Sequence, residues 1–328
     1  MVSVQQAPNR LSSIPKTVIA LAILAVTAIL PAHASATDIL LGTDAAGTFS
    51  HFTGRAICRV ISQHAEGLEC RAVPAPDRIH NLTNLQGGSL DIAMVDATLI
   101  YDAINRKGDF EFLDIRYDNL FLLARVYERA TLLVARGDAE IASLNQLKGK
   151  RINVGPTRSQ TQRSMELILD AKGWTLQDFK KVEALPSSLS QDSMAFCHGS
   201  VQAMLHIGVH PDSTLQHLMA RCNAVPVGID DADIVKLILG HPAYTLVRIA
   251  AATYPNVEQP LSTLGTPVAL VASGSLDEET VGAIMTVLDR FRQTIQHAHP
   301  AIASFTVRDK MPDIGIDLHP GAAAYLGQ

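Results

Sequence analysis

The chain has 328 residues, of which 47% are hydrophobic, and carries a formal net charge of −5 at pH 7. Nucleic-acid binders carry a basic footprint, so this charge argues against a nucleic-acid partner. Aromatic residues make up only 5% of the chain, which argues against a stacking platform for sugars or bases. The length allows two lobes, each with its own core.

The N-terminus predicts export from the cytoplasm. Arg10 and Lys16 precede an uncharged apolar run over residues 17–30, and Pro31 and a series of small residues follow it. This is the pattern of a cleavable signal peptide, which we place at residues 1–36. A membrane anchor is the competing interpretation, but a spanning helix needs roughly 20 apolar residues. We therefore expect no stable membrane insertion of the mature protein.

Strands and helices alternate after the predicted cleavage site. The first six elements are expected as strand, helix, strand, helix, strand and helix over residues 38–42, 51–64, 68–73, 78–86, 91–95 and 97–104. This alternation predicts a parallel sheet that is covered on both faces. Two apolar runs follow, over residues 120–126 and 131–135, and we interpret the second as a crossing between lobes.

A second α/β set follows that crossing. We expect strands over residues 151–154, 201–205 and 224–227, and helices over residues 162–172, 187–196, 214–221 and 229–239. Strand-like runs over residues 244–251 and 266–272 are expected to bring the chain back, before a long helix over residues 277–297.

These elements predict a two-lobed α/β clamshell. Lobe 1 would hold residues 37–129 plus 265–328, and lobe 2 residues 130–264. The crossings would serve as a hinge, and a ligand would lie in the cleft, at loops that follow strand ends.

The most informative stretch is LKGKRINVG over residues 147–155, with the polar loop over residues 157–163 behind it. It predicts a buried strand, a tight turn and a helix that opens among hydroxyl, amide and guanidinium groups. Free backbone N–H groups and the helix dipole make such an opening a site for a carboxylate. The alternative is an ordinary connection with a capped helix.

Four cysteines in an exported chain suggest disulfides. Of the three possible connectivities, the simplest pairs Cys58 with Cys70 and Cys197 with Cys222. Four buried free thiols are the alternative, which an oxidising compartment disfavours.

Catalytic and metal signatures are weak. His206 and His210 have the spacing of a zinc pair, but the segment has no HExxH motif and is expected to be a strand and a loop, so we expect no metal. Serine, histidine and aspartate are plentiful, yet no Gly-x-Ser-x-Gly elbow occurs. We therefore expect a binding protein that is no enzyme and has no cofactor.

Motifs spread along the mature chain match one known family in order and spacing. They are LGT at 41–43, AICR at 56–59, GSLD at 88–91, LKGKRINVG at 147–155, AKGW at 171–174, HP at 210–211, TYP at 253–255 and LHPGA at 318–322. Over about residues 39–325 the chain resembles the TAXI-type solute-binding proteins of TRAP transporters.

This resemblance implies the type II-like fold of periplasmic binding proteins. It also implies a periplasmic receptor that captures a small organic acid and delivers it to the TRAP membrane permease subunits, driven by an ion gradient. The implied ligands are amino acids, dicarboxylates or related carboxylates. Some members share the cysteine pairs, including the step from Cys197 to Cys222, which supports that pairing.

The chain departs from the family in the presumed ligand loops, over residues 44–51, 75–78, 96–98 and 157–162. Arg158 replaces a glycine, Gln162 stands at the family's arginine, and His206 stands at a family tyrosine. Polar groups bury poorly without a partner, so we expect an altered ligand rather than lost binding. The alternative function is a sensor that acts with a membrane signalling protein.

The candidate ligand-binding residues follow from these loops. We assign the ligand carboxylate to Arg158 or Arg163, with hydroxyl donation from Ser159 and Thr161. Thr43, Thr48 and His51 are assigned to the opposite lobe, and Arg78 and Asp96 to the distal or amino end of the ligand. The remaining candidate ligand-binding residues are Gln162, His206 and His210.

Overall fold

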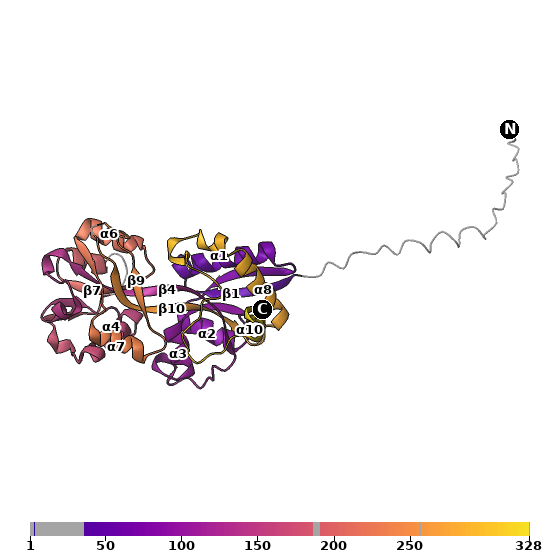
Figure 1. Ribbon diagram of the computed structural model, residues 1–328, viewed down its shortest axis with the longest axis horizontal. Coiled ribbons are helices and arrows are strands. Elements are labelled where there is room, and N and C mark those ends of the chain that lie inside the picture. Colours follow the sequence, from indigo (N-terminus) through magenta and orange to yellow (C-terminus); the bar gives the residue numbers. More distant parts are fainter. Residues whose placement is uncertain (1–2, 4–35, 186–190, 256, 328) are drawn as a thin grey trace. The chain divides into compact units, whose positions relative to one another are not determined.

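The strands of the described chain form one ten-stranded sheet that helices cover on both faces (Figure 1). The structure, a computed structural model, describes residue 3 and residues 36–185, 191–255 and 257–327. The predicted signal peptide therefore lies almost entirely outside the described residues, and it stays a prediction.

The first lobe begins as a parallel sheet. Its three leading strands are β1 (Thr37–Thr43), β2 (Leu68–Pro74) and β3 (Ile92–Asp96), with β1 in the middle. The helices that follow them are α1 (Phe49–His64), α2 (Arg78–Gln86) and α3 (Ala97–Ile104). The predicted bounds of α2 and α3 are confirmed, and the other four elements differ from prediction by one or two residues.

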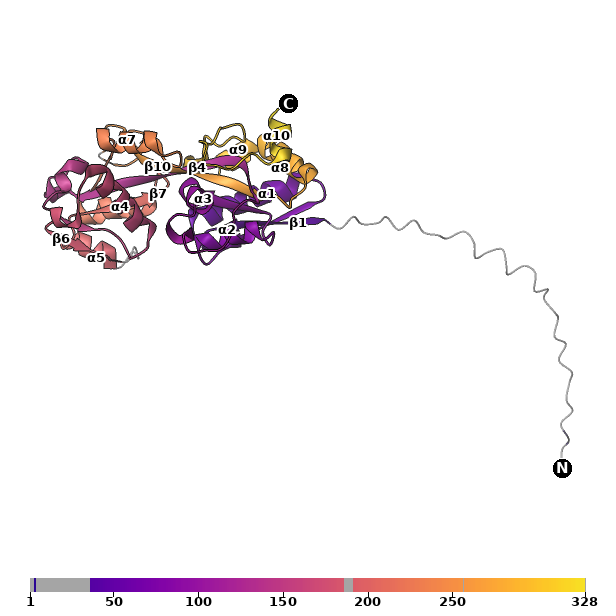
Figure 2. The same ribbon diagram turned by 90° about the horizontal axis from the view of Figure 1, so that it is seen from below.

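Two long antiparallel strands connect the lobes (Figure 2). They are β4 (Leu120–Arg136) and β10 (Leu261–Ser273). The predicted division of β4 into two separate runs is wrong. Glu128 and Arg129 interrupt the apolar pattern, but Glu128 pairs with Arg125 and Arg129 pairs with Asp96, so the strand continues through them.

The second lobe holds five shorter strands. They are β5 (Arg151–Asn153), β6 (Lys181–Glu183), β7 (Ala203–Gly208), β8 (Ala224–Val227) and β9 (Thr245–Ile249). The helices of this lobe are α4 (Gln160–Lys172), α5 (Gln191–Cys197), α6 (Ser213–Cys222) and α7 (Ala232–Gly240). Strand β6 was not predicted. The predicted helix at residues 187–196 falls partly outside the described residues.

The C-terminal part returns to the first lobe. It contains α8 (Glu278–Arg290), α9 (Arg292–Gln296) and α10 (Pro320–Leu326), and the single helix predicted over residues 277–297 is wrong. The helix breaks at Phe291, whose ring stacks on His64 of α1 at a centroid distance of 3.6 Å. Short 3₁₀ helices lie at Gly108–Phe110 (η1), Gly137–Ala139 (η2), Leu144–Leu147 (η3), Leu176–Asp178 (η4) and Pro300–Ile302 (η5).

Each lobe has a buried cluster on both faces of the sheet. In the first lobe α1 and α8 pack on one face, and α2 and α3 pack on the other. In the second lobe α4 and α7 pack on one face, and α5 and α6 pack on the other. The division into residues 37–129 plus 265–328 and residues 130–264 stays a prediction, because β4 and β10 run unbroken through both boundaries.

Two disulfides connect neighbouring elements of the fold. Cys58 of α1 is bonded to Cys70 of β2, with a Cα–Cα distance of 4.8 Å. Cys197 and Cys222, at the ends of α5 and α6, are bonded with a Cα–Cα distance of 4.6 Å. The expected pairing of the cysteines is thus present. Among the residues described, no helix combines the length and apolar character needed to cross a membrane.

Candidate functional site

Three adjoining hollows lie at the junction of the two lobes. The histidine hollow, of about 380 Å³, has His210, Arg125 and Phe305 in its walls. The aspartate hollow is formed around Asp96, and the α3–α4 hollow lies between those two helices. Tyr127 lines the first two hollows and Leu99 lines the last two, so neighbouring hollows share a wall residue.

The α3–α4 hollow is small and polar, about 60 Å³ in volume, and both lobes contribute to it. Its polar side chains come from α3, α4, the strands β4 and β10, and the residue before β9. They are Thr98, Asp102, Thr131, Gln160, Arg163, Ser164, Tyr244 and Thr266. Hydroxyl, carboxyl and guanidinium groups therefore surround a space that could hold the head group of a small polar molecule.

Arg163 is the cation of this hollow. One of its guanidinium nitrogens lies 3.0 Å from the carboxylate of Asp109 in η1, and it also donates to the Arg158 carbonyl at 2.8 Å. Because Asp109 belongs to the first lobe and Arg163 to the second, this ion pair joins the lobes. Its side chains are 38% and 37% exposed, so solvent reaches the pair.

Two groups in the α3–α4 hollow have shifted pKa values. Burial raises the pKa of the Asp102 carboxyl, although Arg163 and Lys107 oppose the shift. Burial, together with the charge of Asp102, raises the pKa of Tyr244 to about 12. The Tyr244 hydroxyl therefore stays protonated at neutral pH and can donate a hydrogen bond.

The opening of α4 is built by its own side chains. Ser159 caps the helix and accepts a hydrogen bond from the Gln162 N–H at 3.1 Å. The Gln162 side chain accepts from the Arg158 N–H at 2.6 Å. Arg158 adopts a positive φ of 63°, and its side chain is exposed. Gly155 (φ +84°) needs to be glycine, because a Cβ there would lie 2.7 Å from Cβ of Thr161.

The loop between β1 and α1 is closed by internal hydrogen bonds. Thr43 is fully buried, and its hydroxyl lies 2.9 Å from Nδ1 of His51. Thr48 caps α1 by accepting from the His51 N–H, and its hydroxyl donates to the Ala45 carbonyl at 2.8 Å. The polar atoms of these three residues therefore hold the loop in this conformation.

Asp96 lies at the end of β3, in the wall of the aspartate hollow. Its carboxylate is 3.1 Å from a guanidinium nitrogen of Arg129, which comes from β4. The Asp96 side chain is only 4% exposed, so this contact holds a carboxylate in a buried position. Arg78 begins α2, and its side chain lies outside what the structure describes.

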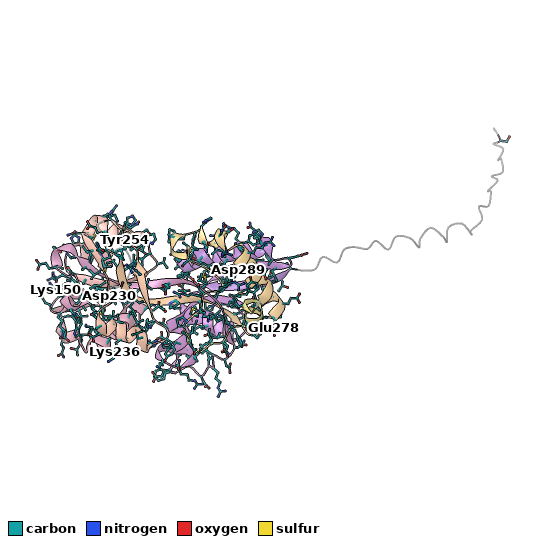
Figure 3. The ribbon with its side chains drawn as sticks, viewed as in Figure 1. Lys150, Asp230, Lys236, Tyr254, Glu278 and Asp289 are labelled. Carbon is teal, nitrogen blue, oxygen red and sulfur yellow. A yellow bond between two sulfur atoms is a disulfide. The ribbon has the colours of Figure 1, made fainter. Side chains whose placement is uncertain are left out.

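His206 lies in β7 and His210 follows it, and Figure 3 labels Tyr254, the hydrogen-bond partner of His210, in the second lobe. Nδ1 of His210 is hydrogen-bonded to the Tyr254 hydroxyl, which also accepts from the Asp212 N–H at 2.8 Å. Nε2 of His206 lies 3.4 Å from the Asp212 carboxylate. Burial, together with the neighbouring His206, lowers the pKa of His210 to about 4, so the imidazole is neutral at pH 7.

The model of the NMT1-like family matches residues 41–327. The chain belongs to the NMT1-like family. Solved structures that it resembles include a TctC solute binding protein from Polaromonas, with 14% identity and a TM-score of 0.56 over 80% of this chain and 86% of that one. XAC2383 from Xanthomonas citri bound to ATP has 14% identity and a TM-score of 0.51, over 88% and 94% of the two chains.

These similarities confirm the predicted fold class of this NMT1-like protein, the two-lobed α/β architecture of periplasmic solute-binding proteins. The Polaromonas neighbour is a solute binding protein. The low identity of these neighbours supports the fold alone, so the ligand has to be argued from the side chains of this chain.

The structure distributes the predicted ligand-binding residues over the three hollows. Arg163 lines the α3–α4 hollow, Asp96 the aspartate hollow and His210 the histidine hollow. The other predicted residues that the structure describes do not line these hollows. They lie at the end of β1, at the starts of α1 and α4 or just before them, and in β7, and they are Thr43, Thr48, His51, Arg158, Ser159, Thr161, Gln162 and His206. Their roles in binding stay predictions.

Sequence reasoning missed several lining residues of this NMT1-like chain. Arg125 and Tyr127 belong to a charged stretch inside an apolar strand, a pattern that could have indicated a cleft floor. Asp102 and Tyr244 gave no such signal, because only the fold brings α3 and β9 together. No group of three or more metal-ligating side chains occurs within the described ranges.

Proposed function

We propose that the protein is an extracytoplasmic solute receptor of the TAXI type, which captures a small organic acid and delivers it to a TRAP permease. The family membership and the fold of its structural neighbours support a receptor. The resemblance of its motifs to TAXI proteins supports the TRAP partner, and the N-terminal sequence supports a periplasmic location. In this proposal the protein is no enzyme, because its role is to bind and release the acid unchanged.

The observation that carries the carboxylate ligand is the convergence at the α3–α4 hollow. Arg163 presents a guanidinium group, which suits a carboxylate because it can donate two parallel hydrogen bonds. Tyr244 and Thr98 add hydroxyl groups from the two sides of the junction. A carboxylate bound here would take the place of Asp109 beside Arg163 and would contact both lobes at once.

Arg163 is a better candidate than Arg158 for this role. Arg163 lines the hollow, whereas the side chain of Arg158 is exposed at the helix opening. Ser159 and Thr161 would act from the same opening. Other candidate residues would contact the rest of the ligand. In the first lobe they are Thr43, Thr48, His51, Arg78 and Asp96, and in the second lobe they are Gln162, His206 and His210.

A thermal-shift screen of the mature chain from Thr37 onward tests this proposal. The library contains amino acids, dicarboxylates, keto acids and aromatic acids. A ligand at 100 times its dissociation constant stabilises the folded state by about 2.7 kcal/mol, which raises the melting temperature by several degrees. We expect a hit that Arg163→Ala abolishes and that Arg158→Ala, the matched control, retains.

Two results would contradict the proposal. A hit that is lost in Arg158→Ala and kept in Arg163→Ala would move the carboxylate to the helix opening. A folded sample that responds to no acid would favour the alternative function, a sensor that acts with a membrane signalling protein.

A further inference from the structure

The histidine hollow is a second candidate binding site, separate from the α3–α4 hollow. Its volume of about 380 Å³ is within the range of small-molecule pockets, whereas the α3–α4 hollow has about 60 Å³. Its walls come from the crossing strand β4, from β9 and from the segment over residues 300–309. A molecule in this hollow would therefore contact the second lobe and the C-terminal part of the first.

The hydrogen bonds around Tyr254 favour one tautomer of His210. The Tyr254 hydroxyl accepts from the Asp212 N–H, so its own proton is free to be donated. Nδ1 of His210 also contacts this hydroxyl, and it pairs the Tyr254 proton if it is the acceptor. A neutral imidazole carries one N–H, so in this tautomer Nε2 of His210 is the protonated nitrogen.

This Nε2–H group is a donor that lacks an acceptor. Nε2 of His210 is inaccessible to solvent and has no hydrogen-bond partner among the described residues. Buried donors are nearly always partnered, so the position calls for an acceptor from outside the chain. A metal ion does not fit here, because a metal binds the unprotonated nitrogen of an imidazole.

The charges and apolar groups of the hollow indicate the kind of acceptor. Arg248 of β9 is exposed, and no ion pair joins it to any of the described side chains, so its guanidinium can bind an anion. Arg125 is already paired with Glu128. Tyr127 and Phe305 are buried and offer aromatic surface. Asp309, on the first-lobe side, repels a second negative charge.

We propose that the histidine hollow binds a small monocarboxylic acid with an apolar body. The carboxylate accepts from Nε2–H of His210 and pairs with Arg248, and the apolar body packs on Tyr127 and Phe305. In this assignment His210 contacts the acid in the histidine hollow and not the solute proposed for the α3–α4 hollow, so neither site needs the other to be occupied. Because its occupant contacts both lobes, it would favour one arrangement of the lobes and act as an effector of the receptor.

Nuclear magnetic resonance of the mature chain labelled with ¹⁵N-histidine tests the proposal. The probes are benzoate, phenylacetate, indole-3-acetate and hexanoate, each compared with its uncharged amide. We expect the free protein to show His210 protonated at Nε2. We also expect at least one acid to shift the His210 signal saturably. Its amide should bind at least about tenfold more weakly than the acid, because a charge-assisted hydrogen bond is lost.

Variants assign the binding to this hollow. Arg248→Ala and His210→Phe should each weaken the acid about tenfold, whereas His210→Gln, which keeps a donor, should retain part of the affinity. For these variants binding is followed by calorimetry, and circular dichroism checks that each is folded. Arg163→Ala should leave this binding unchanged, which separates it from the proposed solute site.

Three outcomes would overturn the inference. The first is a His210 ring protonated at Nδ1. The second is a full panel of acids that leaves the His210 signal unmoved at millimolar concentration. The third is binding that Arg163→Ala removes and Arg248→Ala does not, which would place the acids in the α3–α4 hollow and support the proposed function alone.

Discussion

At the residue scale, the junction of the lobes holds charged side chains in buried positions by pairing them across strands. Asp96 ends β3, and Arg129 lies in the middle of β4, so their contact joins the parallel part of the sheet to a crossing strand. The register of the sheet supports this, because Val268 of β10 lies between Asp96 on one side and Tyr127 on the other.

Removing Arg129 should destabilise the protein strongly. The Asp96 side chain is 4% exposed, and a buried carboxylate that loses its cation costs about 3 kcal/mol. Urea unfolding of Arg129→Ala measures this loss. The control is Arg71→Ala, because the Arg71–Asp38 pair has both side chains 63% exposed and should be worth less than about 1 kcal/mol. Equal losses in both variants would contradict the prediction.

His210 should make stability depend on pH. Its pKa is lowered from 6.5 to about 4, so the unfolded chain binds this proton first as the pH falls. The neutral ring therefore makes its full contribution to the free energy of unfolding above about pH 6.5. This contribution, about 3 kcal/mol, is lost as the pH falls toward 4. Urea unfolding at pH 7 and pH 4.5 should show a smaller loss in His210→Gln than in the wild type. A loss of the same size would mean that His210 does not titrate in this way.

At the element scale, the opening of α4 shows how one side chain can have a structural role where a binding role was predicted. Ser159 was predicted as a hydroxyl donor to a ligand, and its oxygen accepts the Gln162 N–H instead. Thr48 does the same at α1. Sequence patterns cannot separate the two roles, because caps and anion sites both use serine and threonine at helix openings.

Ser159→Ala should therefore affect stability more than ligand affinity. Loss of an N-cap costs about 1 kcal/mol, and Ser159→Asp, which can still cap the helix, should recover most of it. Urea unfolding measures the first effect, and a titration with any hit from the acid screen measures the second. If Ser159→Ala binds the acid tenfold or more weakly while it unfolds like the wild type, Ser159 is a ligand donor.

At the scale of the whole molecule, we predict that β4 and β10 act as a hinge between the lobes. Both strands pass from one lobe to the other, and the Asp109–Arg163 pair lies beside them between η1 and α4. A ligand closes such a hinge when it contacts both lobes more strongly in the closed state. The ion pair therefore favours closure even before a ligand arrives.

Asp109→Asn should shift the ligand-free protein toward open conformations. The pair is partly exposed and is worth at most about 1 kcal/mol, so the ratio of closed to open molecules should fall by no more than about fivefold. Small-angle X-ray scattering should show a larger radius of gyration than that of the wild type. The control is Asp138→Asn, which removes an ion pair between two residues that are close in the sequence, Asp138 and Arg136. Scattering curves that coincide for all three proteins would contradict the prediction.

The sequence by itself determined the α/β alternation, the bounds of α2 and α3 and the pairing of the cysteines. These features depend on residues close along the chain. Asp77 caps α2 at the predicted start of the helix, and the cysteine pairs close loops of 12 and 25 residues. Hydrophobic period, capping side chains and short loops act within a few turns of chain, so they can be read without the fold.

The tertiary structure alone decided the continuity of β4, the break at Phe291 and the composition of the hollows. Glu128 and Arg129 look like the end of a strand until Arg125 and Asp96 are found beside them. Nε2–H of His210 became a candidate donor only when Tyr254, 44 residues away, was seen to occupy Nδ1. A charge or a donor is stable in a buried position only with a partner, and for most of these groups the fold brings that partner from a distant part of the chain.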